Sequence, residues 1–294
     1  MSIDPMELHA KLLPAFEALS SCAVDLQTDM SERLSLIDVA TGAKPSFAAY
    51  ADVHGRRPAL EAIAKLLPGG LRSGFGEMDV HHRYRPFKIA DADLLATVTR
   101  RATCVQPVFW ATRDDRIAEA YAAGRPDRIP DDELLGYPRC CVEWHYDVFF
   151  ARGLEAFCAV AAADGSEEMF GYLREMWRPE SGFYLPDRLF LAAILRSNAR
   201  FPFVEHIACP ACLGSDDSPS GELDDRRSTL ALTVDREGHG RLLVWAKRQT
   251  AAWQTAVAGR AKLFDENAWK CAATPRGRDE YVRHARYLAR AMGL

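Results

Sequence analysis

The sequence lacks any apolar run that approaches the roughly 20 residues needed to cross a bilayer. It also lacks a stripe of lysine and arginine, because 37 basic residues stand against 41 acidic ones and the net charge is −4. These absences disfavour a membrane-spanning protein and a nucleic-acid-binding protein. The first ten residues carry Asp4, Glu7 and His9 where a secretory signal would be apolar, so we expect a cytoplasmic protein.

Internal repeats and a complete phosphate-binding glycine motif are absent as well. Gly74-Phe75-Gly76 is too short for a dinucleotide-binding fingerprint, and no clear strand leads into it, so it predicts a loop. A chain of 294 residues that is 48% hydrophobic can bury a sizeable core. Only Gly214 to Asp225, acidic and rich in serine and glycine, is typical of a surface loop or linker. We therefore expect one compact domain over 1–294.

Hydrophobic periodicity predicts an α+β fold that is predominantly helical. Helices are expected at 5–20, 31–42, 58–67, 91–101, 114–123, 138–153, 154–163, 167–177, 186–200 and 276–292. The β-branched and aromatic residues of 105–111 predict a short strand, which Pro107 assigns to the edge of a sheet. The segments 229–234 and 241–245 flank a turn-like stretch and predict a C-terminal β-hairpin.

The chain has eight cysteines, which in the cytoplasm stay reduced unless they bind metal or take part in redox chemistry. Four of them stand alone and are expected to be small buried hydrophobic residues: Cys22, Cys104, Cys158 and Cys271. The other four lie in two short runs: Cys140 and Cys141, then Cys209 and Cys212. These runs are the strongest indication of a functional site.

The first run opens the helix expected at 138–153. Pro138 favours a helix start, where the positive end of the helix dipole would lower the pKa of the Cys140 and Cys141 thiols. Cys141 shares a face with His145 at i, i+4, so both could ligate one metal ion, and Cys140 has Trp144 at the same spacing. The alternative is that this face belongs to the hydrophobic core.

The second run is His206-x-x-Cys209-x-x-Cys212, a spacing that lets one tight turn present three ligands to a single ion. Joined to Cys140, Cys141 or both, it would complete a four-ligand metal site. A dithiol redox pair and a chance pairing of the two cysteines remain as alternatives, although no clear βαβ strand precedes Cys209.

Three resemblances follow, two from these motifs and one from the chain as a whole. The run Leu135 to Val142, together with the later Cys-x-x-Cys, resembles a poorly characterised bacterial and archaeal family that carries a G-Y-P-x-C-C motif. The order Pro138-Arg139-Cys140 followed by Trp144 looks like the haem-thiolate segment of nitric oxide synthases, although here the Trp follows sooner. The size and the composition of the chain are similar to those of the haem-dependent arginine N-hydroxylases of cycloserine biosynthesis.

The last resemblance implies haem b, dioxygen, an electron donor and a small amino-acid substrate, with L-arginine converted to Nω-hydroxy-L-arginine in antibiotic biosynthesis. Cys140 or Cys141 would be the axial thiolate, which favours O–O cleavage. Trp144 would line the catalytic site, and Glu143 would bind a cationic substrate group or act only as a helix-stabilising charge. The basic, aromatic stretch at 81–87 would hold the substrate carboxylate.

A haem-thiolate monooxygenase is therefore the first functional hypothesis. The second is a zinc-binding scaffold or metalloenzyme of unknown substrate, in which Cys140 or Cys141 joins His206, Cys209 and Cys212. Zinc accounts for both cysteine runs, whereas haem uses one. An iron–sulfur protein is a third possibility by ligand count, but the spacing matches no ferredoxin run.

Overall fold

A computed structural model describes residues 3–22, 26–51, 55–79, 105–152, 159–160, 163–165, 187–258 and 274–293. The helices expected at 91–101 and 167–177 lie outside these residues, as do most of 154–163 and the stretch at 81–87. Cys104, Cys158 and Cys271 also lie outside them.

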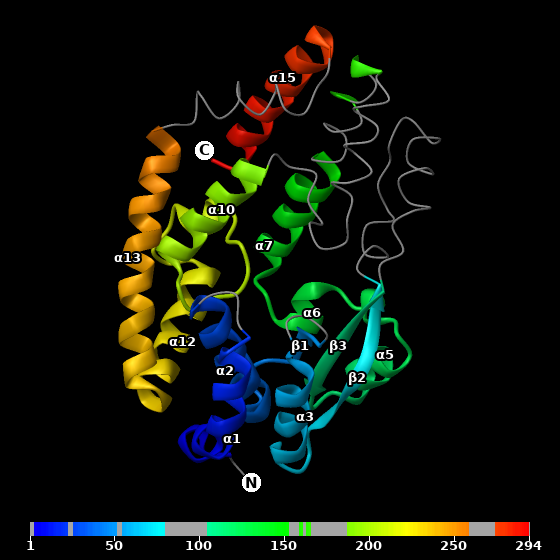
Figure 1. The fold of residues 1–294 in the computed structure, drawn as a ribbon, viewed down its shortest axis with the longest axis vertical. Helices are drawn as coiled ribbons and strands as arrows, with labels where there is room; N and C mark the ends of the chain where they lie inside the picture. The colour runs from blue at the N-terminus through cyan, green and yellow to red at the C-terminus, as the bar shows by residue number, and fades with distance from the viewer. Residues whose placement is uncertain are drawn as a thin grey trace.

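The expectation of a predominantly helical α+β fold is confirmed (Figure 1). The described α-helices are α1 (Pro5–Ser20), α2 (Leu26–Thr41), α3 (Arg57–Leu66), α5 (Asp115–Ala122), α6 (Asp131–Leu135), α7 (Arg139–Trp144), α10 (Asp187–Arg200), α11 (Pro210–Leu213), α12 (Pro219–Val234), α13 (Arg236–Ala258) and α15 (Pro275–Ala291). A 3₁₀ turn, η3 (Pro126–Arg128), precedes α6, and a π-helical segment, η4 (His145–Arg152), continues α7. Within the described residues, no helix is long and apolar enough to span a bilayer.

The strands form one antiparallel sheet in the order β1-β3-β2, with bounds Ser46–Tyr50, Val105–Thr112 and Arg72–Asp79 respectively. The strand expected at 105–111 is therefore present, but its assignment to a sheet edge is wrong because β3 is central. Pro107 is tolerated there because the β1 ladder ends beside it at Val108, and its carbonyl accepts the Ala51 amide at 2.8 Å.

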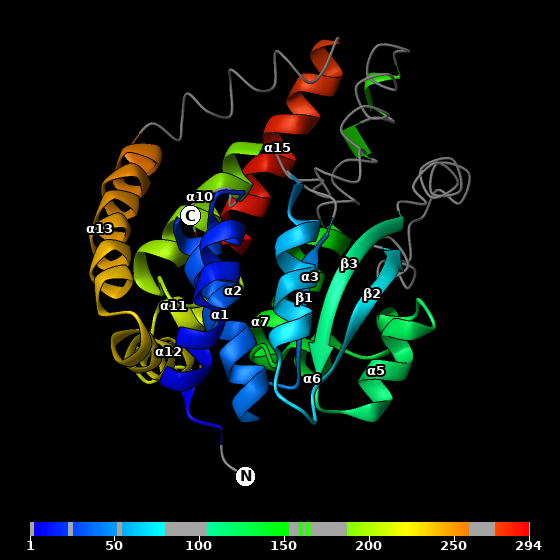
Figure 2. The same ribbon diagram turned by 60° about the horizontal axis from the view of Figure 1, so that its bottom comes forward.

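Helices cover both faces of β3, as Figure 2 shows. Phe109 and Ala111 join the core formed with α1, α2 and α3. Val108 and Trp110 point to the opposite face and pack against α5, where the rings of Trp110 and Tyr121 stack with centroids 5.6 Å apart. This alternation follows the two-residue period of a strand and explains why 105–111 is almost continuously apolar.

The prediction of a loop at Gly74-Phe75-Gly76 is wrong, because these residues lie inside β2. The glycines serve packing on this strand rather than a turn. A Cβ added to Gly74 would lie 3.0 Å from the Trp110 ring, and one added to Gly76 would lie 3.0 Å from the Tyr121 carbonyl oxygen. The missing side chains let α5 approach the sheet closely.

The C-terminal hairpin expected at 229–234 and 241–245 is also wrong, because both segments are helical, in α12 and α13. Ser218 caps the start of α12 by accepting the Gly221 amide at 3.1 Å. At the start of α13, Asp235 accepts the Gly238 amide at 2.8 Å. These caps and the packing of α13 on α10 outweigh the strand propensity of the threonines and valines.

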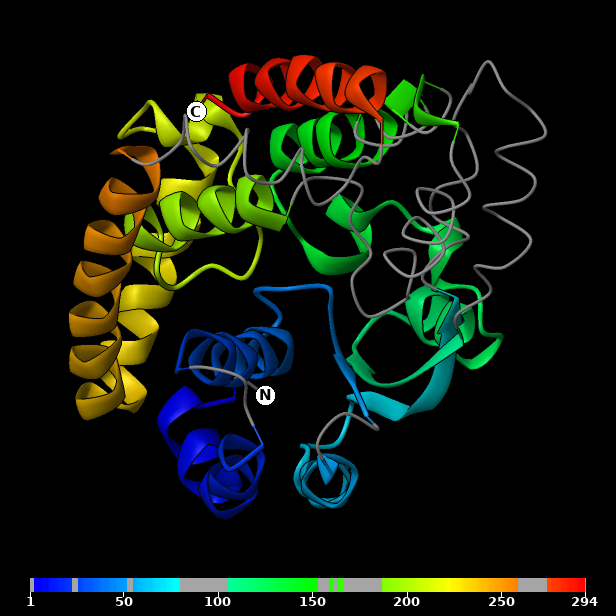
Figure 3. The same ribbon diagram turned by 45° about the horizontal axis from the view of Figure 1, so that its top comes forward.

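The linker expected at 214–225 is only a short turn, since α12 begins at Pro219. Three small residues here are buried: Ser218, Ser220 and Gly221. They allow neighbouring segments to pack closely and do not form a surface loop. Figures 1 and 3 place α7 between the C-terminal helices and the sheet, with α13 at the outer edge of the molecule. This position of α7 determines what surrounds the cysteines.

Candidate metal centre and adjoining pocket

The first cysteine run lies in the opening turn of α7, as the sequence predicts. The helix follows Pro138, whose carbonyl accepts the Cys141 amide at 2.9 Å. Cys141 points inward and is 2% exposed, whereas Cys140 lies on the solvent side. Cys141 is therefore part of the protein interior, and Cys140 lies between it and the solvent.

The second run lies where the chain turns into α11. Cys209 is the residue before the helix and Cys212 lies within it, and both are buried. Phe201, Val204 and Ala208 pack around them in a small apolar cluster that also includes Cys141. Apolar packing thus brings together two segments that are about 70 residues apart in the chain.

All four thiols converge in one place. The Sγ atoms of Cys140, Cys141, Cys209 and Cys212 lie within 4.8 Å of one another. Cys212 Sγ is 3.6 Å from both Cys140 Sγ and Cys141 Sγ, and the latter two are 4.0 Å apart. Around one ion with bonds of about 2.3 Å, tetrahedral sulfurs lie about 3.8 Å apart, so the spacing fits a single metal ion.

Hydrogen-bond donors surround the innermost thiol. The Cys209 backbone N–H donates to Cys141 Sγ at 3.3 Å, and the Ser220 hydroxyl lies 3.3 Å from the same sulfur. Such contacts orient a ligating thiolate and disperse its charge. Ser220 belongs to α12 and is fully buried, and sequence reasoning missed it because an isolated serine carries no signal of its own.

The protein environment alone does not stabilise thiolates at the start of α7. Burial raises the pKa of the Cys140 thiol to about 11 and that of Cys141 further still, so the lowered pKa expected from the helix dipole is wrong here. Burial also raises the pKa of Cys212, but hydrogen bonds from Ser220 and from the neighbouring thiols bring it below its ordinary value. Protonated thiols are poor nucleophiles, and a bound cation is what would deprotonate them.

His206 lies behind Ser220, two hydrogen bonds from the Cys141 thiol, rather than among the four thiols. Its Nε2 lies 2.9 Å from the Ser220 hydroxyl, which in turn contacts Cys141. Its Nδ1 is buried without a hydrogen-bond partner. Burial, reinforced by the charge of Arg227, lowers the pKa of His206 to about 3, so the ring is neutral at neutral pH. The structure thus unites four of the five predicted metal ligands and places the fifth behind Ser220.

Trp144 and Glu143 lie on different sides of α7. The Trp144 indole packs against the cysteine cluster, and its N–H donates to the Ala291 carbonyl of α15 at 3.3 Å. Glu143 is 63% exposed and pairs with Arg139 one turn earlier at 2.7 Å. The contacts of Glu143 are those of a helix-stabilising charge, and the catalytic roles expected for both residues stay predictions.

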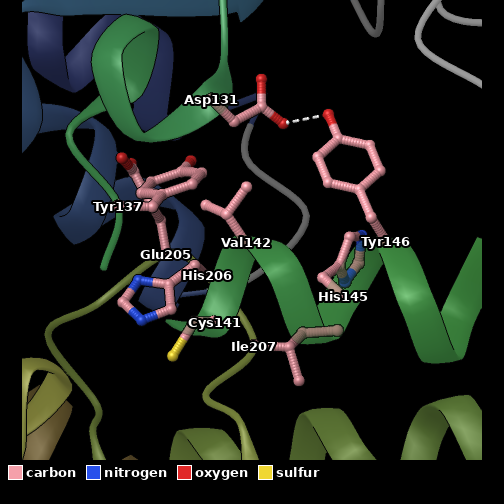
Figure 4. A pocket seen from close by; sticks show the side chains of 9 residues that line it. All are labelled: Asp131, Tyr137, Cys141, Val142, His145, Tyr146, Glu205, His206 and Ile207. Carbon is pink, nitrogen blue, oxygen red and sulfur yellow. Dashed lines mark hydrogen bonds between the residues drawn. The ribbon is translucent and has the colours of Figure 1, made fainter. Parts of the chain in front are cut away.

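A pocket of about 220 Å³ adjoins the cysteine cluster on the side facing α6 (Figure 4). Cys141 and His206 belong to its wall, together with His145. His145 is not among the clustered ligands, so the expectation that Cys141 and His145 ligate one metal ion stays a prediction. Burial lowers the pKa of His145 to about 4. Across the pocket, the Tyr146 hydroxyl donates to Asp131 at 2.8 Å.

Behind the pocket, Glu205 anchors a buried ionic network. Lys44 binds its carboxylate, and Ser35 donates to it at 2.8 Å. Arg227 donates to Asp38 at 3.0 Å and lies 3.7 Å from Glu205. Burial alone would raise the pKa of Glu205, but Lys44 and Arg227 outweigh it and lower the pKa to about 2. This network fixes the segment that carries Glu205 and His206 against α2 and α12.

Comparison with known proteins gives no family model, no curated protein and no solved structure that matches this chain.

Proposed function

We propose that this protein is a zinc metalloprotein whose Cys140, Cys141, Cys209 and Cys212 thiolates hold one Zn²⁺ ion. The observation that carries the proposal is the mutual separation of the four sulfurs, each within 4.8 Å of the others. An iron–sulfur cluster would bind the cysteines through several irons and would spread the sulfurs further apart. Four sulfurs around one ion are typical of a closed, structural zinc site.

The role of the ion is to fasten α7 to the turn that leads into α11. These segments meet mainly through a small apolar cluster, and the two cysteine runs supply two ligands each. A metal bound only by the folded chain contributes its binding free energy to folding. Zinc would therefore hold in place the wall of the pocket that α7 and His206 share.

The proposal places the protein in the reducing cytoplasm. The described cysteines are all free, including three that are buried next to one another. Thiol-reducing systems in that compartment keep closely spaced thiols available to a metal.

Metal analysis of purified protein tests the proposal. We expect one zinc per chain and a colourless solution, and after exchange for cobalt the absorption spectrum of tetrahedral thiolate ligation. Cys212→Ser is expected to lose the zinc, whereas Cys22→Ser keeps it, because Cys22 lies in the turn after α1 and is not one of the four clustered thiols.

The same spectrum tests the other hypotheses. An intense Soret band after expression with added haem would overturn the zinc proposal and support the haem-thiolate oxygenase, with Cys140 or Cys141 as the axial ligand. Stoichiometric iron with a brown colour would support an iron–sulfur protein. A chain that binds no metal when purified under reducing conditions would also overturn the proposal.

A further inference from the structure

The four clustered thiols differ in their access to solvent. Cys140 is exposed, whereas Cys141, Cys209 and Cys212 are buried. Oxidation of a cysteine follows its thiolate character and its exposure, so an oxidant dissolved in water reaches Cys140 before the other three. The cluster thus has one outward-facing sulfur in a site that is otherwise closed.

A bound zinc ion would give this outward-facing sulfur its thiolate character. A thiol that coordinates a metal ion loses its proton to the charge of the ion. The Cys140 sulfur would then be a thiolate that solvent still reaches, which is the form that reacts with oxidants. This step rests on the proposed zinc site.

The thiol best placed to react with an oxidised Cys140 is that of Cys212. The two Sγ atoms lie 3.6 Å apart, and the residues are separated by 72 positions in the chain. Such a pair joins two segments that the fold already holds in contact, so a short movement of the sulfurs would bring them to bonding distance.

The neighbouring Cys141 is poorly placed to pair with Cys140. Its Sγ lies farther away, at 4.0 Å, and the peptide bond between the two residues is trans. Consecutive Cα atoms across a trans peptide are about 3.8 Å apart, below the range of about 4.4–6.8 Å that disulfides usually span. A bond between the adjacent cysteines would therefore strain the first turn of α7.

Contacts within the site hold the Cys141 sulfur in the interior. It accepts the Cys209 backbone N–H at 3.3 Å and lies 3.3 Å from the buried Ser220 hydroxyl. Cys209 itself packs in the apolar cluster with Phe201 and Val204. These two thiols are therefore shielded from an oxidant that reaches Cys140.

We propose that Cys140 is an oxidation site for small hydroperoxides and that Cys212 closes a disulfide with it, which releases the zinc ion. The Cys140 thiolate attacks one peroxide oxygen, the O–O bond breaks, and Cys140 becomes a sulfenic acid as hydroxide leaves. The Cys212 thiolate then attacks the Cys140 sulfur, and a second hydroxide leaves. The two sulfurs lose two electrons to the peroxide, and two protons from solvent convert both hydroxides to water.

The disulfide takes over the mechanical role of the metal. Only Cys141 and Cys209 remain as ligands, too few for a closed tetrahedral site, so the ion leaves. The new bond still joins α7 to α11, and it restricts the unfolded chain by closing a loop of 72 residues. Oxidation thus removes the metal without separating the two segments.

Treatment of the zinc-loaded protein with about one equivalent of hydrogen peroxide tests the proposal. A zinc-binding dye follows release of the ion, and tandem mass spectrometry of alkylated peptides locates the disulfide. We expect nearly all the zinc to be released and one disulfide to join Cys140 and Cys212, with Cys141 and Cys209 alkylated. Zinc that stays bound, or a disulfide between Cys209 and Cys212, would overturn the proposal.

Variants identify the sulfur that reacts first. Cys212→Ser removes the second thiol, so the sulfenic acid should accumulate on Cys140, where the sulfenic-acid trap dimedone labels it. Labelling of Cys141 or Cys209 in its place would contradict the assignment. Cys22→Ser is the control, because Cys22 is a free thiol outside the cluster. It should change the rate of zinc release by less than about two-fold.

Hydrogen exchange on the unaltered chain gives a second readout, which decides the matter if Cys212→Ser does not fold. Backbone amides of 139–144 should stay more protected in the oxidised, zinc-free protein than in reduced protein whose zinc a chelator has removed. Equal exchange in the two samples would show that the disulfide does not hold α7 in place.

Zinc content before oxidation separates the two proposals. A protein that holds no zinc, yet forms the disulfide between Cys140 and Cys212, would refute the metal site and leave the oxidation site standing. A zinc-loaded protein that resists a roughly ten-fold excess of hydrogen peroxide would do the reverse.

Discussion

At the scale of single residues, several buried ionisable groups surround one segment of the protein. Glu205 and His206 are adjacent in the chain, yet one is held charged and the other neutral. Glu205 has Lys44 and Arg227 as counter-charges, whereas burial dominates at His206. These two neighbouring residues thus differ in charge, one ionised and one neutral, because their side chains enter different surroundings.

Glu205→Gln is expected to lower the free energy of unfolding by about 3–5 kcal/mol, the range for breaking one side of a buried ion pair. The loss arises because the buried Lys44 ammonium would lose its carboxylate. Urea denaturation measures it. Glu143→Gln is the matched control, since Glu143 is exposed, and it should leave the stability nearly unchanged. Equal, small effects of both variants would contradict the network.

Acid should destabilise the protein below about pH 6.5. His145 and His206 have folded pKa values of about 4 and about 3, below the unfolded value of 6.5, so the unfolded chain binds more protons between these limits. Their contribution to stability is complete above pH 6.5 and is lost as the pH falls. The Glu205 contribution is lost at lower pH, between 4.5 and about 2.

Urea denaturation at a series of pH values measures this slope. His145→Gln should flatten it between pH 6.5 and 4, because one of the two imidazoles no longer titrates in the unfolded chain. An unchanged slope in that variant would show that His145 has the same pKa in the folded and the unfolded chain.

At the scale of elements, short polar residues and glycines decide where helices begin and how closely they approach the sheet. Ser218 and Asp235 cap α12 and α13, so this part of the chain forms two helices where a hairpin was expected. Gly74 and Gly76 lie inside β2 because Trp110 and α5 fill the space that their side chains would occupy. Both features look like turn signals in the sequence, because turns and close packing use the same small residues.

Gly76→Ala is expected to destabilise the protein by about 1–3 kcal/mol, since its Cβ would meet the Tyr121 carbonyl, which is backbone and yields poorly. Gly240→Ala in α13 is the matched control. Nothing lies within 4 Å of a Cβ there, and alanine favours the helix, so the stability should rise by about 0.4–1 kcal/mol. Thermal unfolding of both variants measures the difference in their stability. If Gly76 lay in a loop, this difference would be absent.

At the scale of the whole molecule, the four cysteines lie in a small apolar cluster that is separate from the main core. The N-terminal helices and the sheet share one apolar core, whereas the cysteine runs lie in a small cluster between α7 and α11. A large core tolerates the loss of one contact, but with the proposed zinc bound, a cluster of this size would depend on its metal.

Metal removal should therefore loosen one region and spare the other. After treatment with a strong zinc chelator, we expect backbone amides of 139–144 and 209–214 to lose protection from hydrogen exchange. Amides of β3 should stay protected, because its neighbours on both sides hold it in the sheet. Mass spectrometry of exchanged peptides measures both, and uniform loss across the chain would show that the metal supports the whole fold.

The sequence by itself determined the helical character, the strand at 105–111, the helix start at the cysteine pair and the interest of both cysteine runs. Those features follow from local periodicity, from proline at a helix start and from ligand spacing, all of which act over a few residues. Only the tertiary structure decided that the two runs meet, that His206 stands behind Ser220, and that a pocket opens beside them. These depend on which distant surfaces pack together, and burial then sets the charge states that no local pattern encodes.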